Sequence, residues 1–415
     1  MDVTAIHNLL QCTLSPDNAQ RRAAEEQIKT LHGQPGFLTA LLQVASHHTV
    51  AKALRQAAGV LLKNTVGRDW SSVPAADKEP IRANILEVAL AEADSSMRDL
   101  LGECIKGIAQ DEFPGCAEAA EGQAPVEWTV LLTTIGRDLQ TTDVQHTYNA
   151  LFLLDKLVEK FAFRRDPTRS PLTTLVDSFL PLVLQIFQKC SESNALQAAQ
   201  LMVLCCQVYW SAMQLKMTGH STGVESVQAW FLLFKTVIDK RLPEASEGVE
   251  PTGQPTEADE RSEWAWWQLK QNALQIAERF FSRYGSVAYC TEEMQPLARW
   301  WTANVANAFS DSCIQLLFSR KSGVFVSERV TQLALGFMAS AIEPALTYAH
   351  IKAQIPSLIF DVILPVLAFN QRDLNLWTSD PHEYVRKTYD FMEDFSDPRL
   401  AGMTFLCDFA RTRKD

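Results

Sequence analysis

Apolar residues recur with the period of an α-helix, about 3.6 residues, along almost the whole chain. No run of alternating apolar and polar residues reaches the length of a β-strand. Clusters of Pro, Gly, Ser and Asp separate the periodic segments and end one helix before the next begins. The sequence therefore predicts helices over residues 3–13, 17–32, 37–46, 50–66, 75–93, 95–111, 126–140, 142–163, 169–190, 194–217, 224–241, 263–284, 291–320, 327–348 and 351–369, with shorter pieces after them.

Taken two at a time, these helices repeat roughly every 40–50 residues, which is the range of HEAT and armadillo repeats. Each pair in such an array contacts only its neighbours, and the stacked pairs present an extended surface to a partner. We therefore predict an all-α fold, a superhelical solenoid of HEAT/armadillo-like helical pairs over residues 1–415. A single globular bundle of the same helices is the alternative.

The segment RQAAGVLLKN, residues 55–64, is expected to form one amphipathic helix that Thr49 caps. Its apolar residues follow the i, i+3, i+4, i+7 pattern of a buried stripe. Lys52, Gln56, Gly59 and Lys63 fall on a different stripe, since steps of four, three and four residues stay on one helical face. Gly59 has no side chain there, so we expect another surface to approach the helix closely at this point.

An acidic segment interrupts the helical rhythm at residues 242–263. It combines three prolines and two glycines with an excess of carboxylates, a composition that cannot bury enough apolar surface to order itself. It is either a solvated insertion loop or an acidic flap that contacts a basic partner, with Glu257, Asp259 and Glu260 as candidate contacts. The tryptophans that follow it, Trp264, Trp266 and Trp267, are expected to pack beneath it.

Composition and motifs exclude several functional classes. Lys and Arg number 38 against 49 Asp and Glu, and the net charge of −11 argues against a DNA-binding surface. The nine cysteines lack metal or disulfide spacing, which favours free thiols in a reducing compartment. Residues 351–369, the longest apolar stretch, contain charges and prolines, so no membrane insertion is expected. Nucleotide-binding, hydrolase, protease and kinase motifs are missing, so we expect neither an enzyme nor a cofactor.

Four motifs occur in order along the chain. The first lies in the helix described above, the second near residue 160, and the others follow the acidic segment. Their residues are Arg55-Gln56…Leu62-Lys63-Asn64…Trp70, Lys160-Phe161…Arg164…Pro167…Arg169-Ser170-Pro171-Leu172, Trp266-Trp267…Lys270…Arg279-Phe280…Arg283-Tyr284-Gly285, and Trp377…Asp380-Pro381-His382-Glu383-Tyr384-Val385-Arg386…Glu393-Asp394-Phe395-Ser396-Asp397-Pro398. Together they resemble the importin-β superfamily, the karyopherins, and within it the amino-terminal portion of the importin-seven and importin-eight branch.

This resemblance implies an importin N-terminal-type domain at residues 21–103 and a receptor that shuttles between cytoplasm and nucleus through the nuclear pore. It implies that Ran in its GTP form binds the first repeats, that the cargo is basic protein, and that phenylalanine-glycine-rich pore proteins are transient partners. The candidate Ran contacts are Lys52, Arg55, Gln56, Lys63 and Asn64. Hydrogen bonding between repeats is an equal alternative for Arg55, Gln56 and Asn64.

Two other functions stay open, an export receptor of the same superfamily and a static HEAT-repeat scaffold without a GTPase partner. Members of this branch are far longer than 415 residues. We therefore expect the chain to represent the amino-terminal arch alone.

Overall fold

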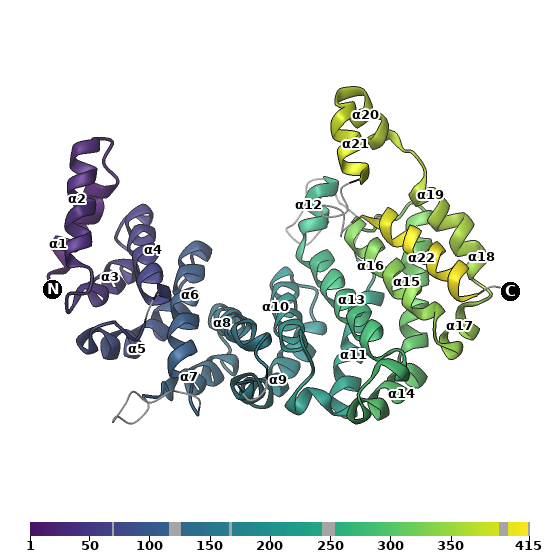
Figure 1. Ribbon diagram of the computed structural model, residues 1–415, viewed down its shortest axis with the longest axis horizontal. Coiled ribbons are helices and arrows are strands. Elements are labelled where there is room, and N and C mark those ends of the chain that lie inside the picture. Colours follow the sequence, from purple (N-terminus) through teal and green to yellow (C-terminus); the bar gives the residue numbers. More distant parts are fainter. Residues whose placement is uncertain (69, 116–125, 166–167, 243–253, 390–396, 414–415) are drawn as a thin grey trace. The chain divides into compact units, whose positions relative to one another are not determined.

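The computed structural model describes residues 1–415 except 69, 116–125, 166–167, 243–253, 390–396 and 414–415 (Figure 1). Helices are the regular elements of the described residues. The chain divides into two compact units, the first formed by Met1–Val183 and Val208–Gly219 and the second by Leu184–Gln207 and His220–Asp415. Helices α9 (Ser170–Ser191) and α10 (Leu196–Ala212) belong partly to each.

The first unit is a stack of helical pairs in two layers. Helices α1, α3, α5 and α7 contact one another in sequence, and α4, α6 and α8 form the second layer against them. Aspartate side chains accept hydrogen bonds from main-chain N–H groups at four helix starts, those of α1, α2, α6 and α8. The bounds are α1 Val3–Thr13, α2 Asn18–Leu31, α3 Phe37–Ser46, α4 Lys52–Arg68, α5 Ala75–Leu90, α6 Ser95–Glu112, α7 Val130–Leu139 and α8 Val144–Ala162.

The second unit repeats this arrangement with an aromatic core. Helices α13, α16 and α22 contact one another in order, while α11, α15 and the segment around the π-helix η4 form the other layer. Phe231 lies with its ring centre 4.8 Å from Phe280 and 5.7 Å from Trp301. The bounds are η1 Gly219–Thr222, α11 Val224–Asp239, α12 Ala258–Glu263, α13 Ala265–Tyr284, η2 Val287–Tyr289, η3 Glu292–Met294, α14 Gln295–Asn304, α15 Ala306–Lys321, α16 Glu328–Ile342, α17 Ala345–Ile351, α18 Ile355–Leu358, η4 Ile359–Ile363, α19 Leu364–Leu367, α20 Gln371–Ser379, α21 Pro381–Tyr389 and α22 Pro398–Thr412.

Three predicted helices are broken in the structure. The helix expected at 291–320 divides into α14 and α15 at Val305, where φ is −118°. The helix expected at 327–348 ends at Ile342 because Pro344 lacks an N–H group and restricts the residue before it. The segment 351–369 becomes α18, η4 and α19, with Pro356 and Pro365 in the first turns of α18 and α19. Helix period alone did not locate these breaks.

Among the described residues, one helix meets the length and composition of a membrane span by itself, and the pair Ala345–Ile351 and Ile355–Leu367, bent by 75°, meets them only when taken together. The single helix is α9, and 44% of its most apolar 18-residue window is buried inside the fold. Residues 351–369 were the segment that the sequence singled out, so α9 was overlooked. A buried core helix satisfies the same criterion.

Candidate partner-binding surfaces

Helix α4, which contains the predicted Ran contacts, begins at Lys52 and packs on α3 and α6. The expected cap by Thr49 is wrong, because the helix starts three residues later and the Thr49 hydroxyl lies 2.8 Å from His47 Nδ1. The open side of α4 contains Ala53, Val60 and Asn64, all exposed. These side chains, together with the exposed Lys52, are therefore available to a partner.

Arg55 lies on the inner side of α4. Its Nε donates a hydrogen bond to the Ala45 carbonyl oxygen at 2.8 Å, and its guanidinium pairs with the Glu92 carboxylate. The side chains of Arg55 and Glu92 are 8% and 2% exposed, so both charges are removed from water and satisfy each other. This arrangement matches the alternative of hydrogen bonding between repeats, because Arg55 has little surface to offer a partner.

Lys52 pairs with a residue of the same chain at the edge of α4. Its Nζ lies 2.5 Å from Asp94 Oδ2, and Asp94 also accepts from the Met97 N–H at 3.1 Å to cap α6. Hydrogen bonding from Lys52 lowers the pKa of Asp94. The Lys52 side chain is 60% exposed, so it remains accessible to a partner despite the ion pair.

Gly59 does allow a close approach, but the approaching surface is α6 of the same chain. A Cβ at Gly59 would lie 3.0 Å from Leu100 Cδ1 and 3.3 Å from Met97 Cε. Gly59 is buried, so its predicted place on an open polar stripe is wrong. The stripe faces the edge of α6 instead, and Gln56 and Lys63 on it are half-buried.

Trp70, the last residue of the first motif, is also architectural. Its indole N–H donates to Glu112 Oε1 at 2.7 Å, and Arg82 Nη1 lies 2.9 Å from Glu112 Oε2. Trp70 is 2% exposed. Sequence reasoning missed Glu92 and Glu112, the buried carboxylates that hold Arg55 and Trp70, since they lie 37 and 42 residues away along the chain.

The end of the acidic segment is helical, contrary to the loop predicted over 242–263. Residues 243–253 lie outside the described part of the chain. After them, Glu257 precedes the short helix α12, and Glu257, Asp259 and Glu260 are exposed. The candidate acidic contacts are therefore accessible.

Arg261 and Trp267 fix this segment to the second unit. Arg261 donates to the carbonyl oxygens of Pro255 and Thr256 at 2.5 and 2.8 Å, and its guanidinium lies 5.2 Å from the Phe325 ring centre. The Trp267 indole N–H donates to Gln254 Oε1 at 3.1 Å. The expected packing of Trp264, Trp266 and Trp267 is confirmed, since all three are buried.

Metal and redox chemistry have few candidates in this structure. Within the described residues, no group of three or more His, Cys, Asp or Glu side chains could hold a metal ion. The eight cysteines that the structure describes are free thiols.

Comparison with known proteins shows similarity to one family of transport receptors. Residues 24–91 match the model of the importin-beta N-terminal domain. Over 408 residues the chain is 29% identical to an importin beta-like SAD2 homolog of Arabidopsis thaliana, covering 96% of this chain and 38% of that protein. It is also 28% identical to importin-8 of Danio rerio, covering 100% of this chain and 40% of that protein.

The chain is therefore similar to members of the importin-β superfamily, in the matched domain and in these relatives. It spans about 40% of the length of these curated relatives. The family match at 24–91 includes α4, so the first motif lies inside the matched domain.

Solved structures of karyopherins share the fold. The exportin Cse1 in its cargo-free, cytoplasmic state superimposes with a TM-score of 0.74 at 16% identity, covering 100% of this chain and 42% of that one. Kap95p, in a structure reporting its binding to RanGDP, gives a TM-score of 0.54 at 18% identity, covering 99% and 42%. The predicted solenoid of HEAT-like helical pairs is confirmed.

Proposed function

We propose that this protein is a nuclear transport receptor that binds the GTP form of Ran through its first repeats and imports protein cargo through the nuclear pore. The observation that supports it most is the edge of α4 formed by the exposed Lys52 and Asn64 and the half-buried Gln56 and Lys63, inside the segment that matches the importin-beta N-terminal domain. The similarity to Kap95p, whose structure was reported with RanGDP, is in keeping with a GTPase partner.

Arg55 is left out of the proposed contact surface because its guanidinium pairs with Glu92 in the interior. Its part would be to hold α4 against the turn before α6, and so to keep Lys63 and Asn64 in position. Val60, which is 40% exposed, joins them as a candidate contact that the sequence pattern did not single out.

The proposed partners besides Ran are basic protein cargo and phenylalanine-glycine-rich pore proteins. The net charge of −11 suits a basic cargo, because complementary charge raises the rate of encounter. Such a receptor would shuttle between cytoplasm and nucleus and pass transiently through the nuclear envelope.

Export is the second candidate function, and one observation favours it specifically. The fold matches the exportin Cse1 with a TM-score of 0.74, above the 0.54 for Kap95p. The importin-8 relative, at 28% identity, supports import instead.

The experiment is a pull-down of the purified chain on immobilised Ran loaded with a non-hydrolysable GTP analogue or with GDP. An importin-type receptor binds the GTP form more tightly, and addition of that form reduces cargo binding. An exporter binds cargo more tightly when the GTP form is added. Equal recovery on both nucleotide states would leave the static scaffold as the function.

A further inference from the structure

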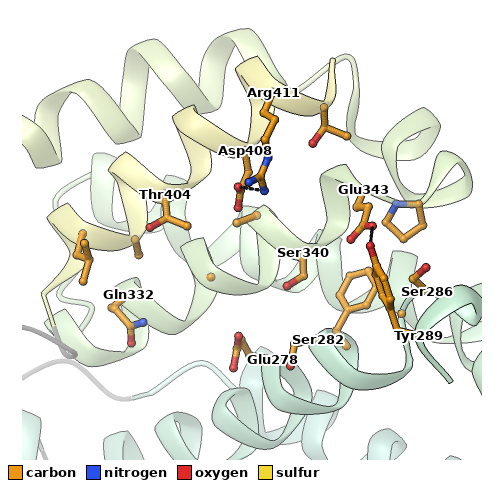
Figure 2. Close-up of a pocket in the computed structure, with 18 of the residues that line it drawn as sticks. Glu278, Ser282, Ser286, Tyr289, Gln332, Ser340, Glu343, Thr404, Asp408 and Arg411 are labelled. Atoms are coloured by element: carbon orange, nitrogen blue, oxygen red, sulfur yellow. Dashed lines mark hydrogen bonds and ion pairs between the residues drawn. The ribbon is translucent and has the colours of Figure 1, made fainter. Parts of the chain in front are cut away.

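A groove of about 400 Å³ opens in the second unit among α13, α16 and α22. This volume is in the range of small-ligand and side-chain binding sites. Figure 2 shows Glu278 and Ser282 on α13, Ser340 on α16, and Thr404 and Asp408 on α22, all at the edge of the same space. Three helices that follow one another in the stack therefore form its walls.

The polar lining follows a regular pattern. Each of the three helices contributes residues four apart, which lie on the same helical face. The pairs are Glu278 with Ser282, Gly336 with Ser340, and Thr404 with Asp408. Because the matching faces of three stacked helices converge, the groove belongs to the architecture of the unit and does not depend on one loop.

Glu278 is a half-buried carboxylate that forms no hydrogen bond or ion pair in the described part of the chain. Burial raises its pKa, and Arg279 and Arg329 act on it only as more distant charges. Gly336 on α16 leaves room beside it, since a Cβ there would lie 3.6 Å from Glu278 Cγ. A carboxylate in this position gains free energy from any donor that enters the groove.

The other charged groups of the lining leave the groove acidic. Glu343 accepts a hydrogen bond from the Tyr289 hydroxyl at 3.2 Å. The only cation among the described lining residues is Arg411, whose side chain is 79% exposed and lies 2.7 Å from Asp408. The Ser282 hydroxyl donates to the Arg279 carbonyl at 3.0 Å, so its oxygen faces a ligand as an acceptor. Carboxylates and hydroxyl oxygens together form a set of acceptors.

We propose that this groove binds a cationic side chain, arginine or lysine, of an extended protein segment, with Glu278 as its central partner. The guanidinium or ammonium group would donate to the Glu278 carboxylate and to hydroxyl oxygens beside it, and its aliphatic stem would lie along Phe281. Arginine suits the site better, because its five donors can contact α13 and α16 together. The proposed transport function supplies only the source of the segment, a cargo protein.

The test is fluorescence anisotropy with the whole chain and a dye-labelled peptide of alternating glycine and arginine. The matched probe replaces every arginine with citrulline, which keeps the shape and removes the charge. Glu278→Gln is expected to weaken binding of the arginine peptide at least tenfold. Glu292→Gln, which removes one exposed charge outside the groove, is expected to change binding less than twofold.

Ser340→Arg, which places a cation inside the groove, provides a second variant and should weaken binding as strongly. Circular dichroism and melting temperature establish that each variant is folded. Equal losses in Glu278→Gln and Glu292→Gln, or equal binding of the citrulline peptide, would overturn the proposal and leave only general attraction to an acidic protein. Ran is absent from this assay, so its outcome is separate from that of the nucleotide-dependent pull-down.

Discussion

The charged residues of α4 and those of the groove among α13, α16 and α22 differ in whether they have ion-pair partners within the chain. On α4, Arg55 and Lys52 both have partners within the chain, Glu92 and Asp94. In the groove, Glu278 has none among the described residues. Arg55 lies in a motif visible in the sequence, and Glu278 belongs to none of the four motifs. A charged residue of a recognisable motif can therefore be architectural, while a carboxylate outside the motifs can be left without a partner in the described part of the chain.

The largest effect is expected from breaking the buried ion pair. Arg55→Met should lower the free energy of unfolding by about 3–5 kcal/mol, because it leaves the Glu92 carboxylate buried without a cation. Lys52→Ala is the control, since its exposed pair with Asp94 should contribute far less to stability. Chemical denaturation followed by circular dichroism measures both. Equal losses of unfolding free energy in the two variants would show that the Arg55–Glu92 pair matters no more for stability than the Lys52–Asp94 pair.

A second buried carboxylate, Asp155, is expected to destabilise the folded protein when it is charged, so its neutralisation should raise stability. Burial raises the pKa of Asp155 on α8 to about 6, although the Ser211 hydroxyl donates to it at 2.9 Å. The native state therefore holds a proton that the unfolded chain has released between about pH 4 and 6, and stability is lost as the pH rises through this window. Asp155→Asn should stabilise the protein by about 1–3 kcal/mol at pH 7.

The Asp155→Asn advantage should vanish near pH 4, where the wild-type acid is neutral. Melting temperatures of both proteins across pH 4–7 measure it. A constant difference over this range would mean that burial of the charge is not the cause.

The buried and the exposed sides of α4 should respond differently when a glycine is replaced by a larger residue. Gly59→Leu should cost about 1–3 kcal/mol, because a larger side chain must displace Leu100 and Met97 on α6. Gly67→Leu is the matched control on the same helix, where a Cβ meets nothing within 4 Å, and helix propensity should make it neutral or stabilising. Thermal unfolding compares them. If Gly59→Leu left stability unchanged, the side of α4 that contains Gly59 would be open, as the sequence pattern predicted.

The smallest effect concerns the acidic segment. Arg261→Ala should cost about 1 kcal/mol, because it removes two hydrogen bonds to carbonyl oxygens and the contact with Phe325. Neutralising Glu257, Asp259 and Glu260 together should change stability by less than about 0.5 kcal/mol, since all three are exposed. Differential scanning calorimetry resolves the two. A larger loss from the triple change would mean that the carboxylates support the fold.

Sequence patterning identified the fold but not the orientation of its surfaces. The predicted helices 3–13 and 37–46 match α1 and α3 residue for residue, because caps and breakers mark their ends locally. Gly59 is buried because α6 packs against it, and the partner of Arg55 lies 37 residues away along the chain. The groove joins residues from 278 to 412, which only the stacking of three helices brings together.

The central claim, that the accessible edge of α4 binds Ran, is tested most directly by the affinity of Lys63→Glu for GTP-loaded Ran. Isothermal titration should show a loss of about 1–3 kcal/mol relative to the wild type, the cost of reversing a charged interface contact. Lys189→Glu, an exposed lysine on α9, should bind as the wild type does. Unchanged affinity in a folded Lys63→Glu variant would contradict the account.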